Sequence, residues 1–131
     1  MKKRTLLATT LAATALLGAP AAYADDWPTR PLTMVIGFNP GGSTDIQGRV
    51  LANVMEEVLG QPVNVVNQPG GGSAVAFTRL ANTEPDGYTF LFGGTTALTF
   101  TPIITEVEYE IDDFEYLAAV AVGQNAIVTS A

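Results

Sequence analysis

The chain has 131 residues, of which 47% are hydrophobic and 15% are charged, and its 13 acidic against 6 basic residues give a formal net charge of −7 at pH 7. It contains neither cysteine nor histidine, which excludes disulfides, thiol nucleophiles, imidazole bases and zinc sites of the usual kind. The acidic balance argues against binding to nucleic acid or to anionic lipid, because both need a basic footprint.

The first 24 residues have the three parts of a secretory signal peptide. Residues 2–4 (KKR) are basic, residues 5–20 form an apolar run, and residues 22–24 (AYA) place small side chains at positions −3 and −1 of a cut. The apolar run is shorter than the ~20 residues that a membrane span needs. We therefore predict cleavage after Ala24, export, and no membrane insertion of the mature chain, residues 25–131.

The first predicted strand covers residues 32–38 (LTMVIGF), a nearly unbroken apolar run that is typical of a strand buried on both faces of a parallel sheet. It stops at the turn signal of residues 39–42 (NPGG). Ser43 or Thr44 is then a candidate helix cap, with Asp45 in the first turn. We predict a helix over residues 46–59, ended by Gly60, whose apolar stripe consists of Ile46, Val50, Leu51, Val54 and Val58.

The same cycle then repeats along the chain. Residues 63–66 (VNVV) are a second strand, and residues 67–72 (NQPGGG) are a second glycine-rich turn. Ser73 is a candidate cap for a shorter helix over residues 74–82. A reverse turn at residues 84–87 (EPDG) leads to the third strand.

The third strand, residues 88–92, ends at a turn that contains Thr95 and Thr96. We predict a short helix within residues 97–104, broken at Pro102, and a surface loop over the acidic residues 106–115. The last two segments, residues 116–122 and 126–130, are apolar and lean toward β structure.

Strand, helix, strand, helix and strand within ~65 residues make a βαβαβ unit, which implies an α/β fold with a parallel sheet and right-handed crossovers. Residue 131 lies within an apolar run, so we expect this sequence to be a piece of a longer protein.

The two glycine-rich turns are the feature that points to function. In a parallel sheet both turns lie at the carboxyl ends of strands, where open α/β folds bind ligands. Glycine lets backbone approach a ligand closely, and a helix start presents unpaired N–H groups and a partial positive charge. Added hydroxyls come from Ser43, Thr44, Ser73, Thr95 and Thr96. Together these donors predict an anion cradle without side-chain cations.

A purely structural interpretation stays open, because such turns and caps also serve chain reversal alone. For Asp45 we favour a role in stabilising the helix start over a contact with ligand. Arg49 lies four residues after Asp45, so an Asp–Arg pair along the helix is its expected role.

Catalytic, metal and cofactor sites are not predicted. The phosphate-loop pattern GxxxxGK[ST] is absent, and the first βα turn lacks a strict GxGxxG. The acidic pairs Glu56-Glu57 and Asp112-Asp113 are adjacent in sequence, so their carboxylates do not face each other on a helix. Without histidine, lysine or cysteine in the mature chain, the one nucleophile–base pair left is a Ser–Asp arrangement, which would need special geometry.

The residues quoted above resemble the Bug-type substrate-binding proteins of tripartite tricarboxylate transporters. The resemblance rests on the blocks Trp27-Pro28-x-Arg30-Pro31, Phe38-x-x-Gly41-Gly42-x-x-Asp45-x-x-x-Arg49, Asn67-x-Pro69-Gly70-x-Gly72, Pro85-Asp86-Gly87-Tyr88-Thr89 and Asp113-Phe114. Three positions depart from it: Gly37, where proline is common, Pro40, where alanine is common, and Ser73, where glycine is frequent.

The resemblance implies a type II periplasmic binding protein, with residues 25–131 as part of its N-terminal lobe and the second lobe absent from this chain. It implies a solute-binding protein that captures a small organic di- or tricarboxylate and delivers it to a membrane permease. Two alternatives are a truncated paralogue with a signalling or structural role and, less favoured, an exported hydrolase. The implied ligand-binding residues are Phe38, Asn39, Gly41, Gly42, Ser43, Thr44, Asp45, Gly70, Gly71, Gly72, Ser73, Thr95 and Thr96.

Overall fold

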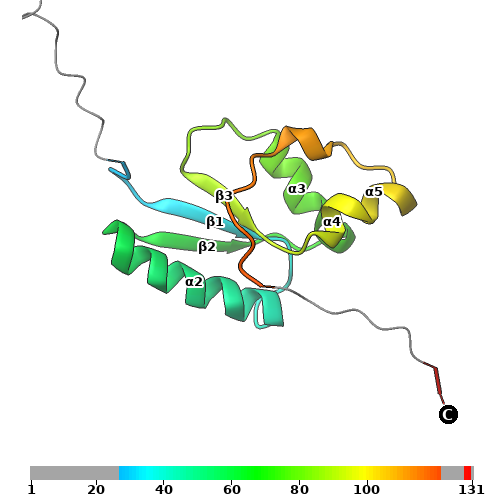
Figure 1. Ribbon diagram of the computed structural model, residues 1–131, viewed down its shortest axis with the longest axis horizontal. Coiled ribbons are helices and arrows are strands. Elements are labelled where there is room, and N and C mark those ends of the chain that lie inside the picture. The colour runs from blue at the N-terminus through cyan, green and yellow to red at the C-terminus, as the bar shows by residue number, and fades with distance from the viewer. Residues whose placement is uncertain (1–26, 122–128, 131) are drawn as a thin grey trace, which may run out of the picture.

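The centre of the molecule is a parallel three-stranded sheet. The computed structural model describes residues 27–121, 129 and 130, so the predicted signal peptide and most of residues 126–130 lie outside the described residues. Strands β1 (Leu32–Ile36), β2 (Val63–Asn67) and β3 (Thr89–Phe92) lie in the order β2-β1-β3 (Figure 1). Met34 of β1 is in register with Val65 of β2 and with Phe90 of β3. The predicted βαβαβ unit and its parallel sheet are confirmed.

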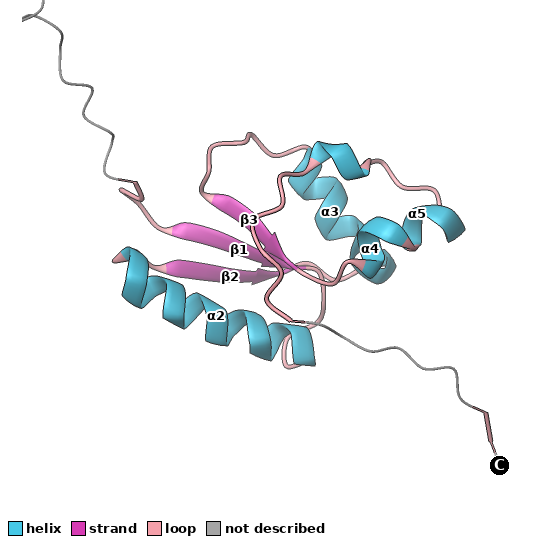
Figure 2. Ribbon diagram, viewed as in Figure 1, coloured by secondary structure: helices cyan, strands magenta, loops and turns pink. Residues whose placement is uncertain are grey.

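Helices cover both faces of this sheet (Figure 2). The long helix α2 (Ser43–Leu59) lies along one face. The opposite face carries α3 (Ala74–Ala81), which follows the 3-10 turn η2 (Gly71–Ser73). The short helices α4 (Thr96–Thr99) and α5 (Thr101–Ile104) lie beside α3, and the 3-10 turn η3 (Ile111–Asp113) comes last. Within the described residues no helix is both long and apolar enough to cross a membrane.

Alternation along the strands divides the core into two layers, because successive strand residues point to opposite faces. Leu32, Met34 and Ile36 of β1 are almost fully buried against α2, together with Ala52 of that helix. On the other face, Leu91 of β3 packs against a second cluster formed by Phe77, Ala97, Leu98 and Tyr109.

The predicted apolar stripe of α2 is wrong. Of its five members, Leu51 packs on the sheet, whereas Ile46, Val50, Val54 and Val58 are 52–79% exposed. The helix instead packs on the sheet through the buried Gly48 and Ala52, together with the half-buried Leu51, Met55 and Leu59. A Cβ on Gly48 would lie 2.5 Å from Ile36 Cδ1, so a larger residue here would displace the Ile36 side chain or move the helix away from the strand.

The predicted cap of α2 is also wrong. The helix begins at Ser43 with Gly42 in the N-cap position, and no side chain caps it. The C-terminal prediction is confirmed, since Gly60 adopts φ 67° and its N–H donates to Glu56 O at 2.9 Å.

The segment after β3 is more ordered than the sequence indicated. Residues 97–104 form two short helices separated at Phe100, and Pro102 lies in the first turn of α5, where its missing N–H costs nothing. The acidic residues 106–115 are only partly a surface loop. Tyr109 is 6% exposed and donates its hydroxyl to Ala97 O, which anchors the segment to the second core layer. Residues 116–121 form no strand.

Candidate functional site

Three loops leave the same edge of the sheet. The first turn (residues 37–42) joins β1 to α2, the second turn (residues 68–73) joins β2 to α3, and the third turn (residues 93–95) joins β3 to α4. Because the strands are parallel, all three loops follow carboxyl ends, as predicted for the first two. The N–H of Gln68 donates to Ile36 O at 2.8 Å, so the second turn starts beside the first.

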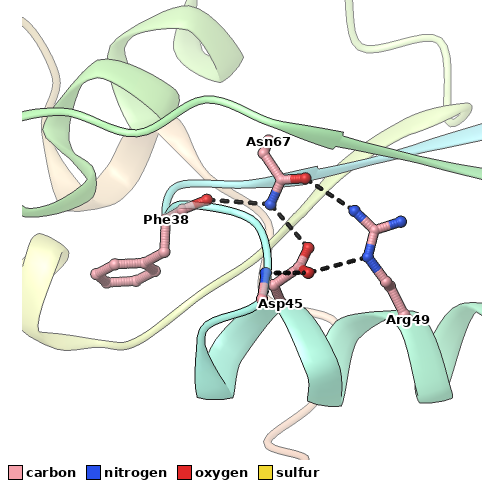
Figure 3. A network of polar contacts seen from close by, with 5 residues as sticks. Phe38, Asp45, Arg49 and Asn67 are labelled. Carbon is pink, nitrogen blue, oxygen red and sulfur yellow. Dashed lines mark hydrogen bonds and ion pairs between the residues drawn. The ribbon is translucent and has the colours of Figure 1, made fainter.

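A polar network ties the first turn to the end of β2 (Figure 3). Asp45 Oδ2 accepts hydrogen bonds from Gly41 N at 2.8 Å and from Arg49 Nε at 3.0 Å. Asp45 Oδ1 accepts from Asn67 Nδ2 at 2.8 Å, and the same amide nitrogen donates to Phe38 O at 3.0 Å. Arg49 Nη2 closes the network by donating to Asn67 Oδ1 at 2.9 Å.

Asp45 is the centre of this network. The residue is 2% exposed, and its carboxylate receives the three donors just described. The hydrogen bond from Arg49, followed by those from Gly41 and Asn67, holds the pKa of Asp45 far below its ordinary value and outweighs the opposite effect of burial. The same pairing raises the pKa of Arg49. The expected Asp–Arg pair along the helix is confirmed.

The backbone of Gly41 makes the network possible. Gly41 adopts φ 81°, a left-handed conformation that L side chains rarely take, and this conformation turns its N–H toward Asp45. No heavy atom lies within 4 Å of the position that a Cβ would occupy on Gly41. The outer side of the first turn is therefore open.

Most of the predicted ligand-binding residues are exposed at this edge. Ten of the thirteen have exposed positions, namely Phe38, Asn39, Gly41, Gly42, Ser43, Gly70, Gly71, Gly72, Thr95 and Thr96. Thr44 is half-buried, and Asp45 and Ser73 are buried. The side chains of Ser73 and Thr95 occupy N-cap positions but make no capping hydrogen bond, so the predicted cap at Ser73 is wrong.

Asn67 is the site residue that sequence reasoning missed. Its position at the start of the second glycine-rich turn predicted a turn, but it did not predict which residue the Asn67 side chain would bond to. Its side chain reaches Asp45, 22 residues earlier in the chain, and helical or strand spacing does not predict such a contact.

Two other sequence blocks meet at the opposite edge of the sheet. Arg30 Nη2 lies 2.7 Å from Asp86 Oδ2, and its guanidinium carbon lies 3.7 Å from the centre of the Tyr88 ring. Tyr88 directly precedes β3, so this cluster lies at the amino ends of the strands, away from the three turns. Among the described residues, no group of three or more acidic side chains is placed to hold a metal ion.

Comparisons with known proteins agree with this architecture. Residues 47–131 match the family model of the tripartite tricarboxylate transporter family receptor. A UPF0065 protein of Bordetella pertussis is 38% identical over 121 residues, which are 92% of this chain and 38% of that protein. Protein BugT of the same organism is 45% identical over 85 residues, which are 65% of this chain and 26% of that protein.

Among solved structures, MatC from Rhodopseudomonas palustris with bound malate is similar in fold. It shares 35% sequence identity at a TM-score of 0.56, over 67% of this chain and 31% of that one. The chain thus spans less than two fifths of the length of each of these three relatives. The matched family is one of transporter receptors and not of enzymes. With more than half of its residues covered by the family model, the chain belongs to the tripartite tricarboxylate transporter receptor family.

Proposed function

We propose that this chain supplies a ligand-binding part of a periplasmic solute-binding protein. The protein captures a small organic di- or tricarboxylate and delivers it to the membrane permease of a tripartite tricarboxylate transporter. The leading segment, residues 1–24, directs export and is removed after Ala24, which intact-mass measurement of the periplasmic form would check. The bound malate of the relative MatC supports the chemical class of the ligand.

One observation carries the proposal: the first and second turns start side by side at one edge of the sheet and expose their backbone. Neither turn contains lysine or arginine. A carboxylate there is held by N–H groups and by hydroxyls such as those of Ser43 and Thr95, in bonds worth about 1.5–3 kcal/mol each for a charged acceptor. Three or four such bonds suffice for a small carboxylate.

Asp45, Arg49 and Asn67 serve in this proposal as positioning residues. All the polar atoms of the Asp45 carboxylate are used within the protein, so it holds Gly41 in place and does not contact the ligand. The predicted direct contact of Asp45 with ligand is therefore replaced by an indirect role. Gly41, whose N–H is bonded to Asp45, and Ser73, which is buried, act on the ligand only through the shape of their turns. The remaining predicted ligand-binding residues keep their proposed direct role.

The test uses two glycines with the same backbone strain. Gly41 (φ 81°) and Gly60 (φ 67°) both adopt left-handed conformations with nothing within 4 Å of an added Cβ, but Gly60 lies at the far end of α2. We expect Gly41→Ala and Gly60→Ala to lower stability by similar amounts, about 1 kcal/mol. Only Gly41→Ala should weaken the binding of malate and citrate.

Calorimetric titration of the full-length gene product would measure this difference, with the dimethyl ester of malate as the uncharged control ligand. Equal affinities for both variants would place the ligand away from the first turn. Turnover of an ester or phosphate substrate by the purified protein would instead support the hydrolase alternative.

A further inference from the structure

Gly37 and Ser73 touch where the first turn begins and the second turn ends. Gly37 is buried directly after β1, and its φ lies outside the left-handed region, so its backbone does not require glycine. A Cβ on Gly37 would lie 1.7 Å from Ser73 Oγ, 2.7 Å from Ser73 Cβ and 3.1 Å from Ser73 Cα. The serine side chain therefore occupies the space that any side chain at position 37 would need.

Ser73 is an unfavourable residue by every local criterion. It adopts φ 84°, and it is the one residue other than glycine with a positive φ in the described part of the chain. It is 1% exposed, and its hydroxyl has no hydrogen-bond partner among the described residues. Glycine would adopt this backbone without strain and would bury no hydroxyl. The Ser73 side chain therefore has one physical role among the described residues, which is to fill the space beside Gly37.

The position of the pair gives that role a consequence for the site. Ser73 directly precedes α3, and its N–H donates to Gly70 O at 2.9 Å, so its place is coupled to the glycines of the second turn. We propose that Gly37 and Ser73 are a size-complementary pair that sets the spacing between the first and second turns. If the site binds a dicarboxylate as proposed above, this spacing determines which length of dicarboxylate the site prefers.

The packing part of the proposal is tested by making Gly37→Ala in three backgrounds: unchanged, Ser73→Ala and Ser73→Gly. The closest atom to the new Cβ moves from 1.7 Å to 2.7 Å and then to 3.1 Å along this series. We expect Gly37→Ala to lower the melting temperature by more than about 10 °C in the unchanged protein and by less than about 5 °C in the Ser73→Gly background. The loss in the Ser73→Ala background should lie between these two values.

Thermal melts of the full chain followed by circular dichroism would measure the series. If Gly37→Ala alone fails to fold, recovery of a folded protein with Ser73→Gly supports the pair. An equal loss of melting temperature in all three backgrounds would overturn the pair. Failure of both double variants, Gly37→Ala with Ser73→Ala and Gly37→Ala with Ser73→Gly, to fold would overturn it too.

The positioning part is tested by the ratio of affinities for malate and the longer dicarboxylate adipate, measured by calorimetry on the full-length gene product. Ser73→Gly should change this ratio at least threefold while the protein keeps its fold. Asn82→Gly at the other end of α3 is the matched control and should leave the ratio unchanged. An unchanged ratio in Ser73→Gly would overturn the positioning role. Failure of the unaltered protein to bind any carboxylate would instead contradict the proposed function, and the melts would still decide the packing pair.

Discussion

Asn67 makes more long-range contacts than any other polar side chain of the site, with bonds to Asp45, Arg49 and the backbone of Phe38. Replacing it by alanine leaves a buried carboxylate oxygen of Asp45 without that donor. We expect Asn67→Ala to lower the free energy of unfolding by about 1–3 kcal/mol, which chemical denaturation would measure.

The control for Asn67 lies on the same strand. Asn64 is exposed on β2 and its side chain makes no hydrogen bond within the described residues. Asn64→Ala should change stability by less than about 0.5 kcal/mol. If the two variants lost the same amount of stability, the effect of Asn67→Ala would come from removing an asparagine from the strand, and the network would not contribute to stability.

Asp45 gives the protein a dependence on acid. The carboxylate has an ordinary pKa of 3.8 when unfolded and a much lower pKa in the folded protein, because the ionised form accepts hydrogen bonds from Arg49, Gly41 and Asn67. The unfolded state therefore binds more protons below about pH 4. The stabilisation from this group is fully present above that pH and is lost as the pH falls.

Unfolding measured between about pH 6 and pH 2 would show this dependence. We expect stability to fall less steeply with acid in Asp45→Asn than in the unaltered protein, although the variant is less stable at neutral pH. Glu57→Gln, at an exposed carboxylate without a hydrogen bond or ion pair in the described part of the chain, should keep the original slope. A slope unchanged by Asp45→Asn would show that other carboxylates govern acid unfolding.

At the scale of the element, helix α2 has small residues at the centre of its buried face and valines on its exposed face. Ala52 is 2% exposed, whereas Val54 is 52% exposed. Ala52→Lys forces a charge and a longer side chain against β1, so we expect it to destabilise the fold by more than about 3 kcal/mol. Val54→Lys should change stability by no more than about 0.5 kcal/mol.

Denaturant titration of both variants would check the orientation of α2. A large loss in Val54→Lys would show that the valines are covered by another part of the protein or by a partner. That outcome would restore the stripe that hydropathy alone predicted.

The strands and turns were predictable because apolar runs and glycine-rich breaks are local signals. The face of α2 was not, because hydropathy ranks Val50 and Val54 above Gly48 and Ala52, whereas close packing on β1 selects for small volume. The burial of Tyr109 was not predicted, because the acidic residues around it indicated a surface loop. A single aromatic residue in such a segment can anchor it to the core. In the site, the glycines could be predicted from turn chemistry, but the contact between Asp45 and Asn67 depends on the pairing of β1 with β2. Gly37 and Ser73 each stood out in the sequence, and only the structure shows that they touch.

At the scale of the whole molecule, the acidic charge affects how an anion reaches the site. Residues 25–131 keep all 13 acidic residues but only Arg30, Arg49 and Arg79, which gives a net charge of −10. The long-range field of this part therefore repels a dicarboxylate, while backbone N–H groups and hydroxyls attract it only at contact. Salt screens the long-range repulsion, with a Debye length of about 10 Å at 0.1 M, but affects hydrogen bonds at contact much less.

We therefore expect the association rate constant for malate to rise severalfold between about 10 and 200 mM sodium chloride, with a nearly constant dissociation rate. Trp27 lies beside Tyr88 at the amino ends of the strands, away from the three turns. A fluorescent label on a cysteine introduced at the exposed Gln47 position is therefore the better probe for stopped-flow measurement. A receptor that captures anions through arginine or lysine shows the opposite trend, because salt weakens its attraction. Affinity that falls steeply with salt would thus reveal a cationic binding site and contradict a cradle built from neutral donors.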